Sequence, residues 1–416
     1  MASPPLRSAV AGIALALVAV VLAPPAQAGS LYAKMERWSS TTELRTGSSA
    51  GVAIANGSMR VSTKPAGTTS FADPYGSKKS KSYDYGMWTS PWVATGFDAT
   101  SMIGSWKADA LNGTWLRVEM RSKTRTKTSS WDTIADWGHS TTGVYRASGS
   151  SQPDDLTRLS TDTVIANDSN KLRNWQIKVT LFRPVGTTST PRLDSVGAIA
   201  SSFVTRSAGV SSTTMTASKE LKVPRYSQMI HKGEFTQWGG GGVAWCSPTS
   251  TSMVMRYFGK GPKPADYSWS KYADSHVDHA ARYTYDHRYE GNGNWPFNTA
   301  YAGRYGLDTF VTKLYNLREA EAFIKAGIPV VASIAFGRGE LTGAPISASE
   351  GHILVITGFS KDGRVIANDP AAPNNSTVRR VYNRAQFERA WLTASGGVTY
   401  VMRPTDVALP PDTARW

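Results

Sequence analysis

Short runs of alternating apolar and polar residues dominate positions 29–205. One run, 116–120, follows the turn pair Asn-Gly at 112–113, and another covers 175–181. Alternation with a period of two is typical of strands that bury one face. Because Gly, Ser, Thr and Pro separate these runs and no helical period is visible, the pattern predicts an all-β first domain, a β-sandwich or jelly roll.

After residue 220 the pattern becomes a mixture of helix and strand signals. Residues 206–219 are small and polar without periodicity, which predicts a linker. Residues 220–416 are therefore expected to form a second domain with an α+β fold. The predicted helices are 246–258, 317–326 and 385–392, and the predicted strands are 330–336, 353–359, 364–368 and 398–403.

The first 28 residues have the order of a secretory signal. Arg7 precedes an apolar stretch over 9–23, two prolines follow, and Ala-Gln-Ala at 26–28 provides small residues for cleavage. The apolar stretch is too short for a comfortable membrane span, and no second run of spanning length follows. We therefore expect a secreted protein, cut after Ala28, without a membrane segment in its mature form.

Composition and charge narrow the classes of partner. Apolar residues make up 40% of the 416 residues, and the formal net charge is +15. The basic residues form no dense run of the nucleic-acid-binding type, so we expect attraction to an anionic surface such as a cell wall and no nucleic-acid partner. Glycan stacking on the many tryptophans of the β domain is possible, but burial in its core is the better expectation.

Cys246 is the single cysteine of the chain. It opens the predicted helix 246–258, with Pro248 in the first turn and Gly259 after the last. A helix N-terminus offers free N–H groups and the positive end of the helix dipole, and both stabilise a thiolate. Although most free cysteines are buried apolar residues, this position indicates a nucleophile.

A cysteine nucleophile needs an imidazole and a group that orients the ring. His352 stands at the start of the predicted strand 353–359, and Asp369 follows the next strand within Asn-Asp-Pro at 368–370. Alone, the histidine could be a core residue and the aspartate a turn former. In the order Cys, His, Asp they match a papain-like arrangement, with Cys246 as nucleophile, His352 as base and acid, and Asp369 as the orienting carboxylate.

Several motifs resemble the C-39-like cysteine peptidases, which are relatives of the double-glycine leader peptidases. They are VPRYSQ at 223–228, QWGGGGVAWCSPTS at 237–250, NWPFN at 294–298, Gly-His at 351–352 and NDP at 368–370. The resemblance is strong over 221–404 and also covers the β half. It implies a papain-like peptidase domain that acts on a peptide or protein substrate, with the three residues above as its catalytic group.

The oxyanion donor is left between two glutamines. The resemblance favours Gln228, while Gln237 is closer to the cysteine in sequence, and Gly240 occupies the position six residues before Cys246. A fixed donor is required because the oxyanion forms only in the transition state. Ser247 replaces the glycine usual in leader peptidases, so cleavage of the leader type does not follow.

No cofactor or metal is expected. His276, Asp278 and His279, with Asp286 and His287 downstream, lack the spacing of a zinc site and are interpreted as a solvated helix beside the cleft. The four glycines at 239–242 lack the Gly-Lys-Ser/Thr of a phosphate loop and are interpreted as allowing close approach of the substrate or as a mobile lid.

The sequence therefore predicts a secreted cysteine peptidase with a separate β domain. Two alternatives stay open at this point. One is a catalytically silent domain within a cell-wall- or glycan-binding protein. The other is an amidase or transpeptidase on cell-wall peptides, which would use the same three residues.

Overall fold

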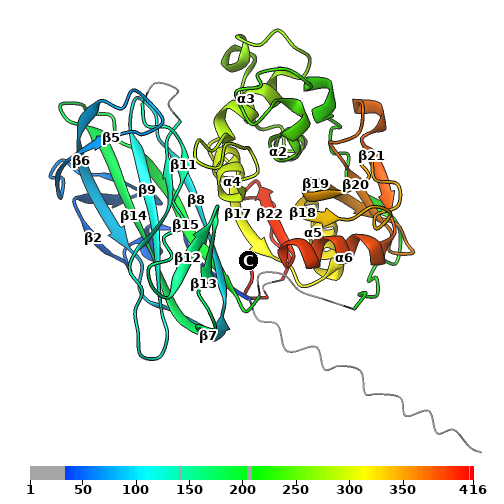
Figure 1. Cartoon of the computed structure of the whole chain (residues 1–416), viewed down its shortest axis with the longest axis horizontal. Coiled ribbons are helices and arrows are strands. Elements are labelled where there is room, and N and C mark those ends of the chain that lie inside the picture. The colour runs from blue at the N-terminus through cyan, green and yellow to red at the C-terminus, as the bar shows by residue number, and fades with distance from the viewer. Residues whose placement is uncertain (1–32, 140–142, 204–208, 412) are drawn as a thin grey trace, which may run out of the picture. The chain divides into compact units, whose positions relative to one another are not determined.

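The computed structural model describes residues 33–139, 143–203, 209–411 and 413–416. The expected signal segment, 1–28, lies outside the described residues. The described part is mostly β, with three antiparallel sheets and few helices, in two domains (Figure 1). The all-β prediction for the first domain is thus confirmed apart from one helical turn, α1 (Thr41–Leu44), which Ser40 caps through its side chain.

The first domain consists of two sheets. One has the order β12-β13-β8-β15-β4-β3, with β1 also paired to β15, and the other has the order β11-β10-β9-β14-β6-β2, with β5 and β7 added to β6 and β14. The strands of the first sheet are β1 (Ala33–Trp38), β3 (Val52–Ala55), β4 (Ser58–Val61), β8 (Ser101–Asp109), β12 (Thr157–Ser160), β13 (Thr163–Ala166) and β15 (Arg192–Ser201). Those of the second are β2 (Ser48–Ala50), β5 (Gly67–Ala72), β6 (Ser80–Thr89), β7 (Val93–Ala99), β9 (Trp115–Lys123), β10 (Asp132–Trp137), β11 (Ala147–Ser148) and β14 (Leu172–Pro184).

Contacts across the two sheets show that they face one another. Trp38 of β1 packs edge-on against Trp88 of β6 and Trp175 of β14, with ring centroids 5.4 and 6.0 Å apart. At Gly104 of β8 a Cβ atom would lie 2.6 Å from Cδ1 of Ile134 on the opposite sheet, so the two sheets approach closely at this point. The tryptophans therefore serve mainly as the core of a β-sandwich.

The third sheet belongs to the second domain and has the order β17-β22-β18-β19-β20-β21, with β16 paired to β19. Its strands are β16 (Lys219–Glu220), β17 (Asp308–Lys313), β18 (Val330–Phe336), β19 (Ser349–Phe359), β20 (Val365–Asn368), β21 (Arg379–Tyr382) and β22 (Val398–Arg403). The helices are α2 (Cys246–Tyr257), α3 (Ser275–Thr284), α4 (Trp295–Gly303), α5 (Leu317–Lys325) and α6 (Arg384–Ser395). Four short 3₁₀ turns are η1 (Gln228–His231), η2 (Gly242–Ala244), η3 (Pro264–Tyr267) and η4 (Asn375–Thr377).

Residues 31–416 form one compact unit, and hydrogen bonds join the two domains within it. The Asp162 carboxylate, in the turn between β12 and β13, accepts from the backbone N–H of Trp295 at 2.8 Å, where α4 begins. Ser105 of β8 accepts from the N–H of Val311 at 2.9 Å. Phe297 of α4 packs on Trp137, with ring centroids 5.1 Å apart. The domains therefore share buried polar and aromatic contacts.

The segment predicted as a linker, 206–219, is described from residue 209 onward. Ser211 binds the carboxylate of Glu388, and Thr213 donates to Glu321 at 2.7 Å. Met215 is buried. From Ser211 on, this segment is therefore held against the second domain, while the domain boundaries given above stay a prediction.

Candidate active site

Cys246 is the first residue of α2 and is partly exposed. The N-cap residue, Trp245, makes no side-chain hydrogen bond to the helix, so the N–H groups of the first turn are not capped by it. Beyond the first turn, Met253, Val254 and Met255 are buried. The thiol is thus held on a rigid element, at the helix end where backbone N–H groups are free to interact with a reacting group.

Backbone conformation and close packing explain the four glycines at 239–242. Gly239, Gly240 and Gly241 have φ values of 72°, 87° and 83°, which residues with a side chain rarely adopt. A Cβ atom at Gly242 would lie 2.3 Å from the carbonyl oxygen of Gln228. These glycines thus permit a close approach between two segments of the chain. The two sequence interpretations, close approach of the substrate and a mobile lid, stay predictions.

His352 lies in β19 and is 3% exposed. Its Nε2 atom is 2.7 Å from Oδ1 of Asp369, which leaves Nδ1 as the ring nitrogen available to the thiol of Cys246. Burial works against the charged imidazole, but Asp369 and Cys246 outweigh it and raise the pKa of His352 to about 10. The ring is therefore expected to be protonated at neutral pH, as in a thiolate–imidazolium pair.

Asp369 follows β20 and is fully buried. Besides His352, its carboxylate accepts from the N–H of Ala371 at 3.0 Å and from the hydroxyl of Tyr382 at 2.6 Å. Burial by itself would raise the pKa of Asp369, but His352 and these donors hold it below its ordinary value. The carboxylate is thus ionised and fixed in direction, as an orienting group must be.

The structure separates the two glutamine candidates. Gln228 is buried at the start of η1, where its Nε2 donates to the carbonyl of Val243 at 2.9 Å and its backbone N–H donates to the carbonyl of Pro370. Gln237 is exposed and does not line the cleft that contains Cys246. Among the described residues Oε1 of Gln228 has no hydrogen-bond partner. The structure therefore brings Gln228 together with the three other residues and leaves Gln237 outside.

Cys246, His352 and Gln228 line one cleft of about 810 Å³. Both domains contribute to its wall. The first domain supplies the turn between β12 and β13. The second domain supplies residues of α2 and β19, of the glycine loop (239–242) and of the loop before α4 (289–293). Among the lining residues are Ser160, Thr161, Asp162, Thr163, Met229, Gly239, Val243, Tyr289, Glu290, Trp295, Ile346, Glu350 and Ala371.

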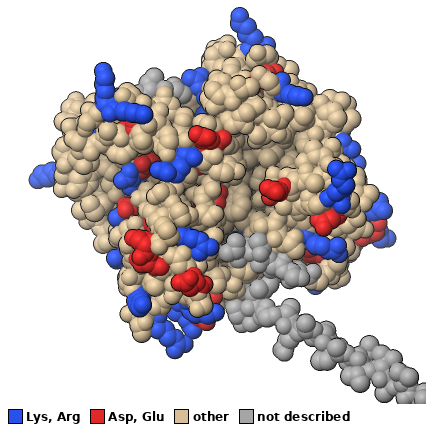
Figure 2. Space-filling view, in the orientation of Figure 1, with Lys and Arg blue, Asp and Glu red and all other residues tan. Residues whose placement is uncertain are grey.

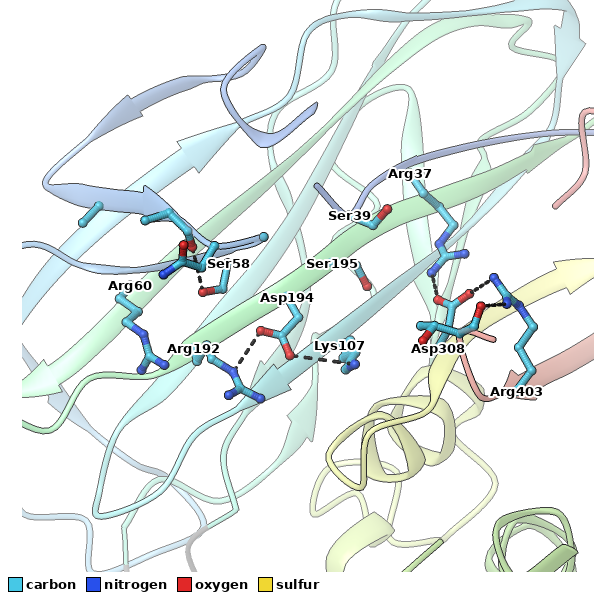
Figure 3. A pocket seen from close by; sticks show the side chains of 15 residues that line it. Arg37, Ser39, Ser58, Arg60, Lys107, Arg192, Asp194, Ser195, Asp308 and Arg403 are labelled. Atoms are coloured by element: carbon cyan, nitrogen blue, oxygen red, sulfur yellow. Dashed lines mark hydrogen bonds and ion pairs between the residues drawn. The ribbon is translucent and has the colours of Figure 1, made fainter. Parts of the chain in front are cut away.

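A second hollow, of about 800 Å³, shares no lining residue with this cleft. Figure 3 shows the side chains that line it. Arg37 and Arg403 both pair with Asp308, and Arg192 and Lys107 face Asp194. These contacts engage most of the cations and both carboxylates in pairs with each other. We therefore assign this hollow to the support of the fold and not to the chemistry.

One group of described residues could hold a metal ion: His231, Glu234 and Asp278. Nδ1 of His231 lies 2.8 Å from Glu234 and 2.9 Å from Asp278, and Ser270 donates to the other oxygen of Asp278. Although burial opposes the charged ring, the two carboxylates raise the pKa of His231. An ion-pair cluster accounts for these contacts. The backbone of His231 lies against Gly242, and the Trp245 ring packs on the His231 ring at 5.8 Å between centroids.

The interpretation of residues 276–287 as a solvated helix is wrong. In α3 the side chains of His276, Asp278 and His279 are buried, because this helix packs against α2 and α4. Nδ1 of His279 is 2.8 Å from the Tyr301 hydroxyl, and the Asp286 carboxylate is bound by Asn294 at 2.9 Å. These polar groups are internal supports and do not meet at one point.

Together, the fold and the cleft define a two-domain, mostly β protein with a cysteine, a histidine and an aspartate assembled at one site. The chain belongs to the C39-like peptidase family: residues 34–201 match the family described as "Peptidase C39 N-terminal domain", and residues 220–398 match the "Peptidase_C39 like family". No curated protein matches. A solved structure of a protein from Bacillus anthracis, described as C39-like, is 16% identical with a TM-score of 0.29, covering 44% of this chain and 96% of its own.

Two contributors to the site were missed by the sequence reasoning. Tyr382 could be suspected from no motif, since it reaches Asp369 only through the pairing of β20 with β21. Asp162 lies in the turn between β12 and β13, and that turn forms part of the cleft wall. Its neighbours in the second domain depend on how the two domains pack, which no local pattern in the sequence indicates.

Proposed function

We propose that the protein is a secreted cysteine peptidase in which Cys246 is the nucleophile, His352 the base and acid, and Asp369 the orienting carboxylate. The observation that carries the proposal is the position of His352. Its Nε2 is bound to a buried carboxylate at 2.7 Å, and against the effect of burial Asp369, with a further contribution from Cys246, raises its pKa. Membership of the C39-like family supports a peptide or protein substrate. The N-terminal sequence supports export.

The proposed reaction has two halves. The Cys246 thiolate attacks the carbonyl carbon of the peptide bond, the C–N bond breaks, and the imidazolium of His352 gives its proton to the leaving amine. The product bound to the enzyme is a thioester. Water then attacks the carbonyl carbon of the thioester while His352 removes a proton from the water. The C–S bond breaks, which releases the carboxylic acid and restores the thiolate. A papain-like fold for the second domain is part of this proposal.

The tetrahedral intermediates place negative charge on the former carbonyl oxygen. In the proposal, Nε2 of Gln228 and the backbone N–H of Cys246 meet that charge. Gln228 is suited to the role because Val243 holds its amide by one N–H, and a primary amide has a second N–H to offer. Removal of one such donor commonly costs about 10²–10³ in kcat.

An active-site probe and a substrate screen test the proposal together. One sample of the purified protein is treated with a fluorescent iodoacetamide, with Cys246→Ala as the control for labelling. A separate, untreated sample is incubated with a defined peptide library, and the products are identified by mass spectrometry. Labelling of Cys246 together with cleavage that disappears in Cys246→Ala is the expected result. Labelling without cleavage of any peptide would favour the silent-domain alternative.

None of the described helices is long and apolar enough to cross a membrane. Trp92 and Trp131 are partly exposed in the β domain, but each stacks with cations of the same chain, Arg121 among them. No glycan-binding role is proposed on this basis.

A further inference from the structure

The charges that line the cleft differ in sign from the protein as a whole. The chain carries a formal +15, and Lys and Arg side chains are scattered over the face shown in Figure 2. Among the described residues that line the cleft there are three carboxylates and no lysine or arginine. The carboxylates are Asp162, Glu290 and Glu350. Apart from these, the lining includes His352, whose ring pairs with Asp369. A cleft in which one sign of charge prevails focuses its field on whatever enters.

The three carboxylates come from separate segments around the proposed nucleophile. Glu350 lies two residues before His352 in β19, and Glu290 lies in the loop before α4, next to Tyr289. The acidity is therefore not the property of one local run. Glu290 and Glu350 are exposed, so their charges can reach a ligand in the cleft without a change of fold.

Asp162 is different because it is 7% exposed and its donors are neutral. Its oxygens accept from the Trp295 N–H at 2.8 Å and from the Thr163 hydroxyl at 3.1 Å. Among the described residues no cation forms an ion pair with it. Burial lowers the pKa of Lys313, and the charge of Asp162 opposes this shift. The Lys313 ammonium donates to the carbonyl of Phe203, however, and Lys313 does not line the cleft. A buried carboxylate without a paired cation favours a positive ligand beside it.

We propose that this cleft selects peptide segments that carry positive charge, lysine or arginine side chains or a free amino group, next to the bond that is cleaved. This specificity rests on the proposed peptidase function. In it, Glu290 and Glu350 attract the cationic segment into the cleft, and Asp162 of the first domain adds a third acidic group to the cleft wall. The first domain is thereby part of the substrate site.

The first test measures the cleft charge without turnover. Cys246, the single thiol, is modified with two methanethiosulfonate reagents of similar size, the cationic aminoethyl and the anionic sulfonatoethyl compound. The ratio of their rates is compared between wild type and the double variant Glu290→Gln/Glu350→Gln. Asp168→Asn is the matched control, because Asp168 is an exposed turn residue outside the cleft lining, and asparagine tolerates its φ of 51°.

The cation/anion rate ratio is expected to fall by about four- to tenfold in the double variant and to stay unchanged in Asp168→Asn. Comparison between variants cancels the effect of the His352 charge, which all of them share. A ratio that does not change in the double variant would overturn the proposal. Both variants replace exposed side chains by isosteric amides, so loss of the fold is not expected to confuse the result.

The second test uses matched substrates. Peptides that differ only in lysine, acetyl-lysine or glutamate beside the cleaved bond are compared by kcat/KM. Lysine is expected to exceed acetyl-lysine by about tenfold in wild type and by less than about threefold in the double variant. Equal rates for the three peptides would contradict the charge preference and leave the peptidase function standing. No cleavage of any peptide, with the reagent ratio still dependent on the two glutamates, would refute the peptidase function alone.

Discussion

The hydroxyl of Tyr382 donates a 2.6 Å hydrogen bond to Oδ2 of Asp369, whose other oxygen faces His352. The aspartate is thus bound on both sides, by the ring that it orients and by a phenol on the neighbouring strand. Tyr382 is itself fully buried, and its phenolic pKa is raised by burial and by the Asp369 charge. The carboxylate therefore cannot turn away from His352 without losing a second bond.

Replacement of Tyr382 by phenylalanine removes the hydrogen bond to Asp369 and keeps the aromatic ring. We expect a loss of about 1–3 kcal/mol in stability, because a buried charged acceptor loses its donor, and a fall in kcat with KM nearly unchanged. Tyr257→Phe is the matched control, since the Tyr257 hydroxyl donates to the carbonyl of Gly327 away from the cleft. Urea unfolding and steady-state kinetics measure both effects. If kcat stayed normal in Tyr382→Phe, the phenol would have no part in orienting the site.

Replacements of the catalytic candidates should fall in a definite order of activity. Cys246→Ala is expected to be inactive, and His352→Ala to lose at least about 10³-fold, because members of one catalytic unit are not additive. Asp369→Asn should retain more activity than Asp369→Ala, since it keeps an acceptor oxygen, and both should exceed His352→Ala. The value of kcat and the melting temperature are measured for all four. Near-normal turnover in His352→Ala, with Cys246→Ala inactive, would assign the base to another histidine.

The stability that His352 contributes should decline at alkaline pH. Its folded pKa of about 10 lies above the ordinary 6.5, so the contribution is fully present below about pH 6.5 and is lost as the pH rises toward 10. The difference in unfolding free energy between wild type and His352→Gln should therefore shrink between pH 7 and pH 10. It is measured by urea unfolding along this range.

His287→Gln serves as the control for this pH dependence. Burial and Arg146 lower the pKa of His287 to about 4, so its contribution is present above about pH 6.5 and is lost only as the pH falls toward 4. The difference between wild type and His287→Gln should thus be flat from pH 7 to pH 10. A flat curve for His352→Gln as well would show that His352 is not held in its charged form.

The stability contribution of Asp162 should also fall as the pH rises, but in the mildly acidic range. Burial raises its pKa from 3.8 to about 7, so the folded state prefers the protonated acid, and stability is lost as the pH rises from about 4 through 7. Asparagine at this position keeps an acceptor for the Trp295 N–H without the charge. Relative to wild type, Asp162→Asn should gain in melting temperature on going from pH 5 to pH 8. A gain of the same size at both pH values would contradict the raised pKa.

Much of the second domain could be predicted from local signals. The helix that begins at Cys246 and the strand Val330–Phe336 lie where the pattern placed them, because proline in a first turn, glycine after a helix and a β-branched apolar run act locally. Helix α4 (Trp295–Gly303) was missed, although Asn294 as N-cap and proline in the first turn are signals of the same kind. Its motif had been used only for the family resemblance.

Contacts between segments distant in sequence could not be predicted in the same way. The approach of His352 to Asp369 follows from the pairing of β19 with β20, which the order of strands suggested. The bond from Tyr382 needs a further strand in register, and the place of Asp162 needs two domains in contact. Each of these depends on packing between segments, which no local pattern of apolar and polar residues encodes.

The hydrogen bond from Trp295 to Asp162 also bears on how such a protein can change over generations. A single turn of the first domain both caps the start of α4 and forms part of the cleft wall. A gene fusion that placed the second domain behind another module would leave that helix start without its acceptor and open one side of the cleft. The two domains are thus expected to be inherited together and not to be recombined separately with other domains.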